Sequence, residues 1–248
     1  MHVPLKFTKH RIEEYALRVT YRPEEDTGTI IYNLSLIESR DLEFTLSILK
    51  EAHTTGTTIS DRIRVAGPGE VVDGYTVPDG RYGICTMCSI TLDALLLQHG
   101  IPLNPIGGGI VEVEERVAQR FTSMILYRDT TLDPLEVLIS QEATSILDVM
   151  RHGNGNILAN IRECHMEAES LMGMVLDELS TMGFSGVLDV GAPNVPLLGV
   201  PVSPQYVGVA IVGGTNAMAA VKEAGRPVVT RALKGLIDIQ EMGYLEDY

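Results

Sequence analysis

The sequence has 248 residues, of which 45% are hydrophobic, and it carries a formal net charge of −14 at pH 7. A chain of this length and composition can form one large domain, or two closely packed halves, around a substantial core. The negative charge argues against direct binding of DNA or RNA, because such binding requires a basic surface.

The first half of the chain predicts alternating strands and helices. Residues 1–22 are basic, and we interpret residues 15–21 as a strand after a polar lead. Residues 29–37 alternate as a strand does, and the leucines of residues 42–54 share one helix face. The further elements predicted here are strands at 59–65, 82–87, near 103 and 110–114, and a helix at 90–99. Two strand–helix–strand units in succession are the order of a ferredoxin-like plait.

Residues 116–153 join the halves and are too apolar for a flexible linker, so we expect them to be structured. We predict strands at 124–127 and 135–140 in this region, and a helix at 144–151. The second half then repeats the first. Its predicted strands are at 156–162, 187–190, 207–212, 228–231 and 236–240, and its helices are at 166–182 and 217–224.

The two halves are related by an internal duplication. A shift of 127 residues aligns Asn33 with Asn160, and a shift of 125 residues aligns Gly83 with Gly208. Most such matches fall on turn residues, which fix backbone geometry. We therefore predict an α+β fold that duplicates a ferredoxin-like βαββαβ unit (an alpha-beta plait). The parts are a first half with its N-terminal lead (1–115), the joining region (116–153) and a second half (154–248), which together form one domain.

Two strand-to-helix turns, one in each half, are candidates for anion binding. In each, an apolar strand ends in a short turn with residues suited to a helix cap, and a helix follows. The turn residues are Cys88, Ser89 and Thr91 in the first half and Gly213, Gly214, Thr215 and Asn216 in the second. Such a turn directs N–H groups and a helix dipole at one point, which suits a carboxylate. Many turns of this type bind nothing, so the pattern leaves both interpretations open.

Cys88 raises the alternative of catalysis. A thiol at a helix N-terminus has a lowered pKa and can act as a nucleophile or, with Cys85, as a redox pair. Cys85 falls within a strand, however, and a small thiol that lines a binding pocket is the other interpretation. The six histidines show no metal-ligand spacing, and no glycine-rich loop is followed by the lysine of a P-loop. We therefore assign no catalytic residue, no metal and no cofactor.

Arg162 lies at the end of a predicted buried strand. Its planar guanidinium is suited to clamp a carboxylate, although a salt bridge with Glu163 or a surface position would also account for it. Pro193 and Asn194 lie in a loop that corresponds to residues 67–69 of the first half. We expect these two loops to border a cleft between the halves.

These segments resemble a known family. GICTMCSITLDALLLQHGIP, GNILANIRE, DVGAPNVPLLGVPV and VGGTNAMAAVKEAG are similar to signature segments of the regulatory domain of NrpR, the archaeal nitrogen regulatory protein. GGGIVEVEE and TTLDPLEVLIS fit the same family, so the resemblance covers nearly the whole chain.

The resemblance implies a non-catalytic domain whose effector is 2-oxoglutarate and whose family represses nitrogen-assimilation genes. The effector would contact the two turns, Arg162, Pro193 and Asn194. DNA contact would come only from a helix-turn-helix segment, which we expect to lie outside this chain. A Cys88-dependent enzyme and a ligand-free interaction module remain alternatives from other classes.

The apolar joining region, together with the two-fold symmetry of regulators of palindromic DNA, predicts a homodimer. We expect the protein to be cytoplasmic and not to contact a membrane. The predicted helices are too short and polar to span a bilayer, and the N-terminus has no apolar signal region. Only three cysteines are present, as is usual in a reducing compartment.

Overall fold

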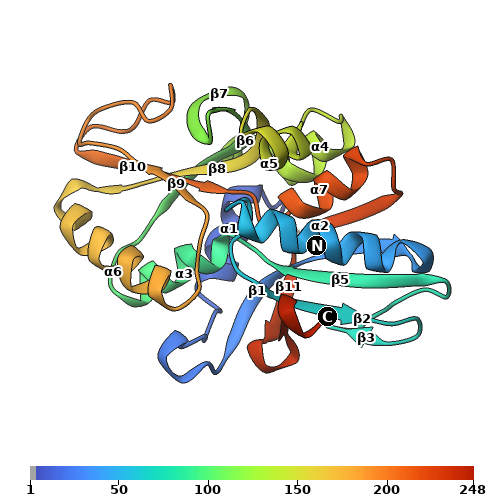
Figure 1. Ribbon diagram of the computed structural model, residues 1–248. Coiled ribbons are helices and arrows are strands. Elements are labelled where there is room, and N and C mark those ends of the chain that lie inside the picture. Colours follow the sequence, from blue (N-terminus) through green and yellow to red (C-terminus); the bar gives the residue numbers. More distant parts are fainter. Residues whose placement is uncertain (1–3) are drawn as a thin grey trace.

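Two five-stranded antiparallel sheets form the frame of the computed structural model, which describes residues 4–248. The strand orders are β11-β1-β5-β2-β12 and β7-β6-β8-β10-β9. In the view of Figure 1 the sheet of β8 and β10 lies above the sheet of β1 and β5, with helices both between these two levels and beside them. This arrangement buries the central strands on both faces, and Ile30, Ile31, Leu158 and Ile211 have no exposed surface.

Each half of the chain supplies the six elements of a plait in the expected order. In the first half they are β1 (Thr29–Glu38), α2 (Leu42–Thr54), β2 (Arg62–Ala66), β5 (Arg81–Met87), α3 (Ile90–Gln98) and β6 (Asn104–Glu114). In the second half they are β8 (Gly155–His165), α6 (Glu169–Thr181), β9 (Val187–Val190), β10 (Tyr206–Val212), α7 (Asn216–Glu223) and β11 (Val228–Asp238). The predicted duplicated ferredoxin-like α+β fold is confirmed.

The last strand of each half belongs to the sheet of the other half. β6 pairs with β8, with Ile110 opposite Leu158, and β11 pairs with β1, with Ile237 opposite Ile30. A self-contained plait would instead pair its fourth strand with its own first strand. The two halves therefore exchange strands, and neither sheet is complete without residues from both. The sequence shows the duplication but not this exchange, because equivalent strands have equivalent patterns.

Further elements extend the sheets. β7 (Val117–Leu126) adds to β6, and the short β12 (Gly243–Tyr244) adds to the outer edge of β2. A small hairpin of β3 (Val71–Val72) and β4 (Tyr75–Thr76) lies between β2 and β5 in sequence. The predicted separate strands at the end of each half are single continuous strands, β6 and β11.

Two predicted strands are wrong: one covers a helix end and the irregular segment after it, and the other is a helix. Residues 15–21 follow and partly belong to α1 (Thr8–Ala16), whose Ile12 is buried in the core. Residues 135–140 lie in α4 (Pro134–Ser140), which precedes α5 (Ile146–His152). The side chain of Asp133 accepts hydrogen bonds from the backbone N–H groups of residues 135 and 136. Asp-Pro is thus a helix start, and the apolar residues that follow it have helical spacing.

No helix among residues 4–248 is both long enough and apolar enough to cross a membrane.

Candidate functional site

The two predicted turns meet at the centre of the molecule. Thr86 Oγ donates a 2.9 Å hydrogen bond to the carbonyl oxygen of Gly214, which ties the end of β5 to the turn before α7. A Cβ atom at Gly214 would lie 2.3 Å from the carbonyl oxygen of Met87, so only glycine permits this approach. The turns enclose a cavity of about 20 Å³ whose lining includes Cys88, Ser89 and Gly214. That volume is enough for about one water molecule.

Arg162 is fully buried beside this cavity and is held by Asp93 of α3. Its Nε atom donates to Asp93 Oδ1 at 2.5 Å, and its Nη2 atom donates to Ser89 Oγ at 3.1 Å. Neither the predicted pair with Glu163 nor a surface position is found, because residue 162 faces the helices and Glu163 faces the opposite side of β8. Within the described chain, Arg162 Nη1 and Asp93 Oδ2 lack hydrogen-bond partners. The pair is therefore incompletely satisfied.

Polar side chains of β8 and of the segment after β7 complete a central polar cluster, which we define as Ser89, Asp93, Tyr127, Asn160 and Arg162. Asn160 Nδ2 donates to Ser89 Oγ at 2.9 Å, and Tyr127 Oη donates to Asn160 Oδ1. Asn160 and Arg162 share one face of β8 because strand side chains alternate. All members are less than 5% exposed. Buried polar groups of this kind must be paired, which fixes the geometry of the cluster.

Burial dominates the acid–base properties of the central polar cluster. It raises the pKa of Asp93 to about 6, although the neighbouring Arg162 guanidinium acts in the opposite direction. It also raises the pKa of the Tyr127 hydroxyl well above its ordinary value. Nearby Asp133 has a pKa of about 6, mainly through burial and then through the charge of Glu136. Two carboxyl groups close to the cavity therefore titrate near neutral pH.

The side chains of the predicted turn residues Thr91 and Asn216 form hydrogen bonds with the backbone of β1 and β8. Thr91 Oγ accepts from the N–H of Ile31 and donates to its carbonyl oxygen, at 3.2 and 3.3 Å. Asn216 bonds the N–H and the carbonyl oxygen of Leu158 in the same way, at 2.9 and 3.0 Å. Both polar ends of the Asn216 amide are thus occupied by the protein, and the Thr91 hydroxyl both donates and accepts. Gly213 acts alongside them, because its N–H donates to the carbonyl oxygen of Leu158.

The expected helix caps differ from the structure. Ser89 and Thr215 stand at the N-cap positions of α3 and α7, but neither side chain makes a capping hydrogen bond. Ser89 Oγ accepts from Arg162 and Asn160 instead. Thr215 is buried, and its Oγ has no partner among the described residues. The local sequence pattern marks the helix starts correctly, but tertiary contacts decide where these hydroxyl groups point.

Pro193 and Asn194 lie away from the turns. Asn194 accepts a hydrogen bond from the N–H of Gln205, next to the first residue of β10, whereas Gly213 and Gly214 follow the last residue of that strand. A strand of this length separates its ends by about 20 Å. The loop of Asn194 folds back on β10, and residues 67–69 form a turn closed by the Glu70 N–H, which donates to the Gly67 carbonyl oxygen. The cleft expected between these two loops stays a prediction.

The sequence interpretation missed Asp93, Tyr127 and Asn160 as parts of the candidate site. Asp93 had a detectable signal, since it is the only charged residue in the apolar helix ITLDALLLQ and stands four positions after Ser89. Asn160 had one too, because it repeats Asn33 of the first half. Tyr127 reaches the cluster only through the packing of the joining region, for which the sequence offers no local sign.

The thiols do not have the properties of a nucleophile. Cys85, Cys88 and Cys164 are free and buried, and burial raises the pKa of Cys85 and of Cys88 to about 12. These two cysteines are therefore protonated at neutral pH, which removes the main support for a Cys88-dependent enzyme. No group of three or more His, Cys, Asp or Glu side chains within residues 4–248 is arranged to hold a metal ion.

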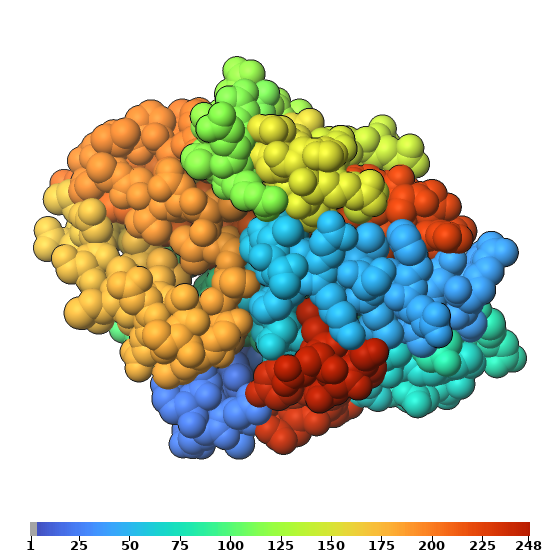
Figure 2. All heavy atoms as spheres, viewed as in Figure 1, coloured from blue at the N-terminus to red at the C-terminus, as the bar shows by residue number. Residues whose placement is uncertain are grey.

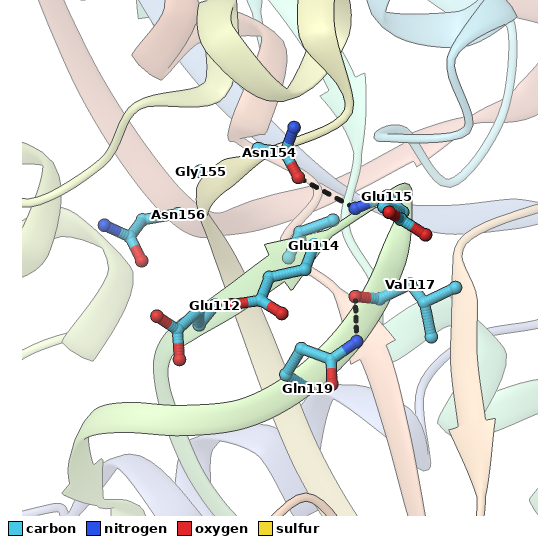
Figure 3. Close-up of a pocket in the computed structure, with 9 residues that line it drawn as sticks. Glu112, Glu114, Glu115, Val117, Gln119, Asn154, Gly155 and Asn156 are labelled. Carbon is cyan, nitrogen blue, oxygen red and sulfur yellow. Dashed lines mark hydrogen bonds between the residues drawn. The ribbon is translucent and has the colours of Figure 1, made fainter.

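A larger surface pocket of about 610 Å³ is unsuited to an anion. It lies at the turn between β6 and β7 and is lined by Glu112, Glu114 and Glu115, with the Glu115 N–H donating to Asn154 (Figure 3). Three carboxylates would repel a dicarboxylate, and the nearby Arg120 is paired with Glu112 at 2.8 Å.

The comparison with known families agrees with the resemblance. A model of the family described as "NrpR regulatory domains NRD1 and 2" matches residues 5–244. The chain belongs to this family. The family description names a regulatory domain, not an enzyme.

Similar proteins carry related names. The chain is 36% identical over 236 residues to "Global nitrogen regulator NrpRI" of Methanosarcina mazei, and the match covers 95% of this chain and 72% of that protein. It is 32% identical to "Global nitrogen regulator NrpR" of Methanocaldococcus jannaschii, where the match covers 91% of this chain but only 37% of that protein. The crystal structure of "a nitrogen repressor-like protein MJ0159" from Methanococcus jannaschii aligns with a TM-score of 0.82 and 29% identity, over 98% of this chain and 100% of that one.

Proposed function

We propose that this chain is the effector-binding domain of a nitrogen regulator and that its effector is 2-oxoglutarate. The observation that carries the proposal is that the two duplicated turns face one cavity beside a fully buried arginine. A five-carbon dicarboxylate has two charged ends, and the start of each helix offers a positive dipole end to one of them. Family membership and the names of the relatives support the coarser part of this proposal, a regulatory role in nitrogen control.

Binding of 2-oxoglutarate requires the site to open. The cavity of about 20 Å³ is too small for a dicarboxylate, and Asp93 occupies Arg162. We propose that one effector carboxylate replaces Asp93 on the guanidinium of Arg162. The other carboxylate then accepts hydrogen bonds from the N–H groups at the start of α7. The two turns must separate for this, so effector binding shifts the sheet of β8 relative to that of β5.

Such a shift is the change of shape that a regulator must transmit, because an effector acts only by binding one conformation more tightly than another. Arg162 is needed for a second reason. The net charge of −14 repels a dianion at long range, and a buried cation restores the attraction locally.

The proposed partners rest on the exposed surface and on the family resemblance. We propose a homodimer, with α6 and β9 as the contact region, because Leu171, Met174, Val187 and Val190 are exposed there. A groove of about 410 Å³ runs between α3, α6 and β9, and Figure 2 shows a hollow beside the gold segment that contains α6. DNA contact belongs to a separate helix-turn-helix segment, and the location is the cytoplasm.

Calorimetric titration of the full chain with 2-oxoglutarate tests the effector assignment. Glutarate, which lacks the 2-oxo group, is the matched ligand, and Arg120→Gln on the exposed hairpin is the matched control for Arg162→Gln. We expect 2-oxoglutarate to bind reversibly and to be recovered without chemical change. Arg162→Gln should weaken its binding by about tenfold or more, since hydrogen bonds to charged groups contribute about 1.5–3 kcal/mol. No heat with 2-oxoglutarate at millimolar concentration, or equal binding by Arg162→Gln, would overturn it.

A further inference from the structure

A second pocket, of about 510 Å³, lies on the face of β8 opposite the central polar cluster. Its lining combines charged groups with apolar walls. Lys9 of α1, Arg128 and Glu163 supply the charges. Ile106, Met124, Leu126 and Val200 supply the apolar surface. This volume is in the range of small-molecule sites.

Glu163 is the buried polar centre of this pocket, with 3% of its surface exposed. Its Oε1 atom accepts from Asn104 Nδ2 and Ser203 Oγ, and its Oε2 atom accepts from the Ser203 N–H, all at 2.7 Å. A carboxylate has about four acceptor sites, so Oε2 has room for one more donor. Lys9 Nζ donates to Asn104 Oδ1 at 2.6 Å. The side-chain amide of Asn104 therefore links the Lys9 ammonium group to the Glu163 carboxylate.

The duplication shows that the fold does not require this polar set. Asn104 is opposite Glu163 in the β6–β8 ladder, and the equivalent pair in the β11–β1 ladder is Val229 opposite Leu36. The position equivalent to Ser203 is Pro78. The sheet of β1 thus builds the equivalent ladder from apolar residues. Burying a carboxylate has a cost that hydrogen bonds only partly offset, so a buried glutamate in one sheet only, with one acceptor site still open, points to a ligand.

We propose that this pocket binds an α-amino acid with an aliphatic side chain. The ammonium group donates to Glu163 Oε2, the carboxylate is held by Lys9 and Arg128, and the side chain packs on the apolar walls. A site with a buried anion and two cations at its rim favours a ligand that carries both charges over one that carries either alone. The pocket is separate from the 2-oxoglutarate site, and each assignment stands or fails without the other.

Titration of the unmodified full chain with three related compounds tests the charge pattern. L-Leucine carries both charges, 4-methylpentanoate lacks the ammonium group, and 3-methylbutylamine lacks the carboxylate. We expect L-leucine to bind at least tenfold more tightly than either analogue. Equal binding of L-leucine and 4-methylpentanoate would show a simple anion site and overturn the proposal. Absence of L-leucine binding at 10 mM, which is on the order of the weakest metabolite affinities, would overturn it as well.

Two pairs of variants locate the ligand. Glu163→Gln should weaken the binding of L-leucine about tenfold and leave the weaker binding of 4-methylpentanoate unchanged. Lys9→Met should weaken both, and Lys6→Met is its control because Lys6 pairs with Glu14 on the exposed side of α1. If Glu163→Gln binds L-leucine as tightly as the parent while its melting temperature is unchanged, the assignment is wrong. The analogue series on the unmodified chain decides the question if that variant does not fold.

Discussion

Thr91 and Asn216 occupy equivalent positions in the two halves and hold equivalent strands, Thr91 at Ile31 and Asn216 at Leu158. The positions differ by the 125-residue shift and their partners by the 127-residue shift of the duplication. Different side chains thus perform the same task, because either a hydroxyl group or an amide can bond the N–H and the carbonyl of one residue.

Asn216→Ala should therefore destabilise the fold without acting on a ligand directly. It removes the side-chain partner of the Leu158 N–H and one of the two donors to the Leu158 carbonyl oxygen, which keeps the Gly213 N–H. An unsatisfied buried group costs about 1–3 kcal/mol. We expect the free energy of unfolding in urea to fall by about 2 kcal/mol or more. Affinity for 2-oxoglutarate, measured well below the melting temperature, should be unchanged, and a selective loss of affinity at unchanged stability would contradict this role.

The Arg162–Asp93 pair predicts an asymmetric double-mutant cycle. Removing one partner of a buried pair costs about 3–5 kcal/mol, whereas replacing both with apolar residues costs much less. Asp93→Leu should cost more than Arg162→Met, because a stranded aspartate can take up a proton and a stranded arginine cannot. Urea unfolding of both single variants and of the double variant measures this. Additive effects of the two changes would mean that the pair is not coupled.

Effector binding should take up protons near pH 6. The pKa of Asp93 is already about 6, and Arg162 holds it below the value that burial alone would give. Displacement from Arg162 therefore raises this pKa further, so affinity should increase as the pH falls from about 7 toward 6. Titrations in two buffers of different ionisation enthalpy measure the proton uptake. It should vanish in Asp93→Asn and persist in Asp133→Asn; persistence in both would point to another group.

The same shift affects stability. A carboxyl group whose pKa is raised on folding stabilises the fold when protonated, fully below its ordinary pKa of 3.8, and this contribution is lost as the pH rises through about 6. The contribution of Asp93 to the free energy of unfolding should therefore decrease between about pH 4 and 6, a window set by these two pKa values, and stay level above it. Comparison of the urea midpoints of the parent and Asp93→Asn across this range isolates that contribution.

Replacement by alanine should change the free energy of unfolding in opposite directions at Gly214 and at Gly173. A Cβ atom at Gly214 would overlap the backbone of Met87, so Gly214→Ala should destabilise by about 1–3 kcal/mol. Gly173 lies within α6 with nothing near its Cβ position, so Gly173→Ala should stabilise by about 0.5–1 kcal/mol. Thermal and urea unfolding of both variants check this, and a neutral Gly214→Ala would mean that the turns are farther apart.

The strand exchange predicts that neither half folds alone. A fragment of residues 1–115 lacks β11 beside β1 and contains β6 without β8. We expect the separate fragments 1–115 and 116–248 to lack a cooperative thermal transition, and an equimolar mixture to regain the circular dichroism spectrum of the whole chain. A cooperative transition in the first fragment by itself would contradict the exchange.

The sequence by itself determined the duplication, the strand-to-helix turns and most of the regular elements. Glycine positions, caps and apolar periodicity act over a few residues, so a pattern such as residues 206–225 predicts β10 and α7 directly. The start of α4 is equally local, because Asp133 caps the helix and Pro134 occupies its first position.

Only the tertiary structure decided which strands pair and which charges meet. β1 has the same pattern whether β6 or β11 lies beside it, because both strands lie more than 60 positions away in sequence and no local feature of β1 selects between them. Arg162 likewise had Glu163 next to it in the chain, yet strand alternation turns that carboxylate to the opposite face and packing brings Asp93, 69 residues distant, within 2.5 Å. Local backbone preferences fix each element, but long-range partners depend on which surfaces bury each other.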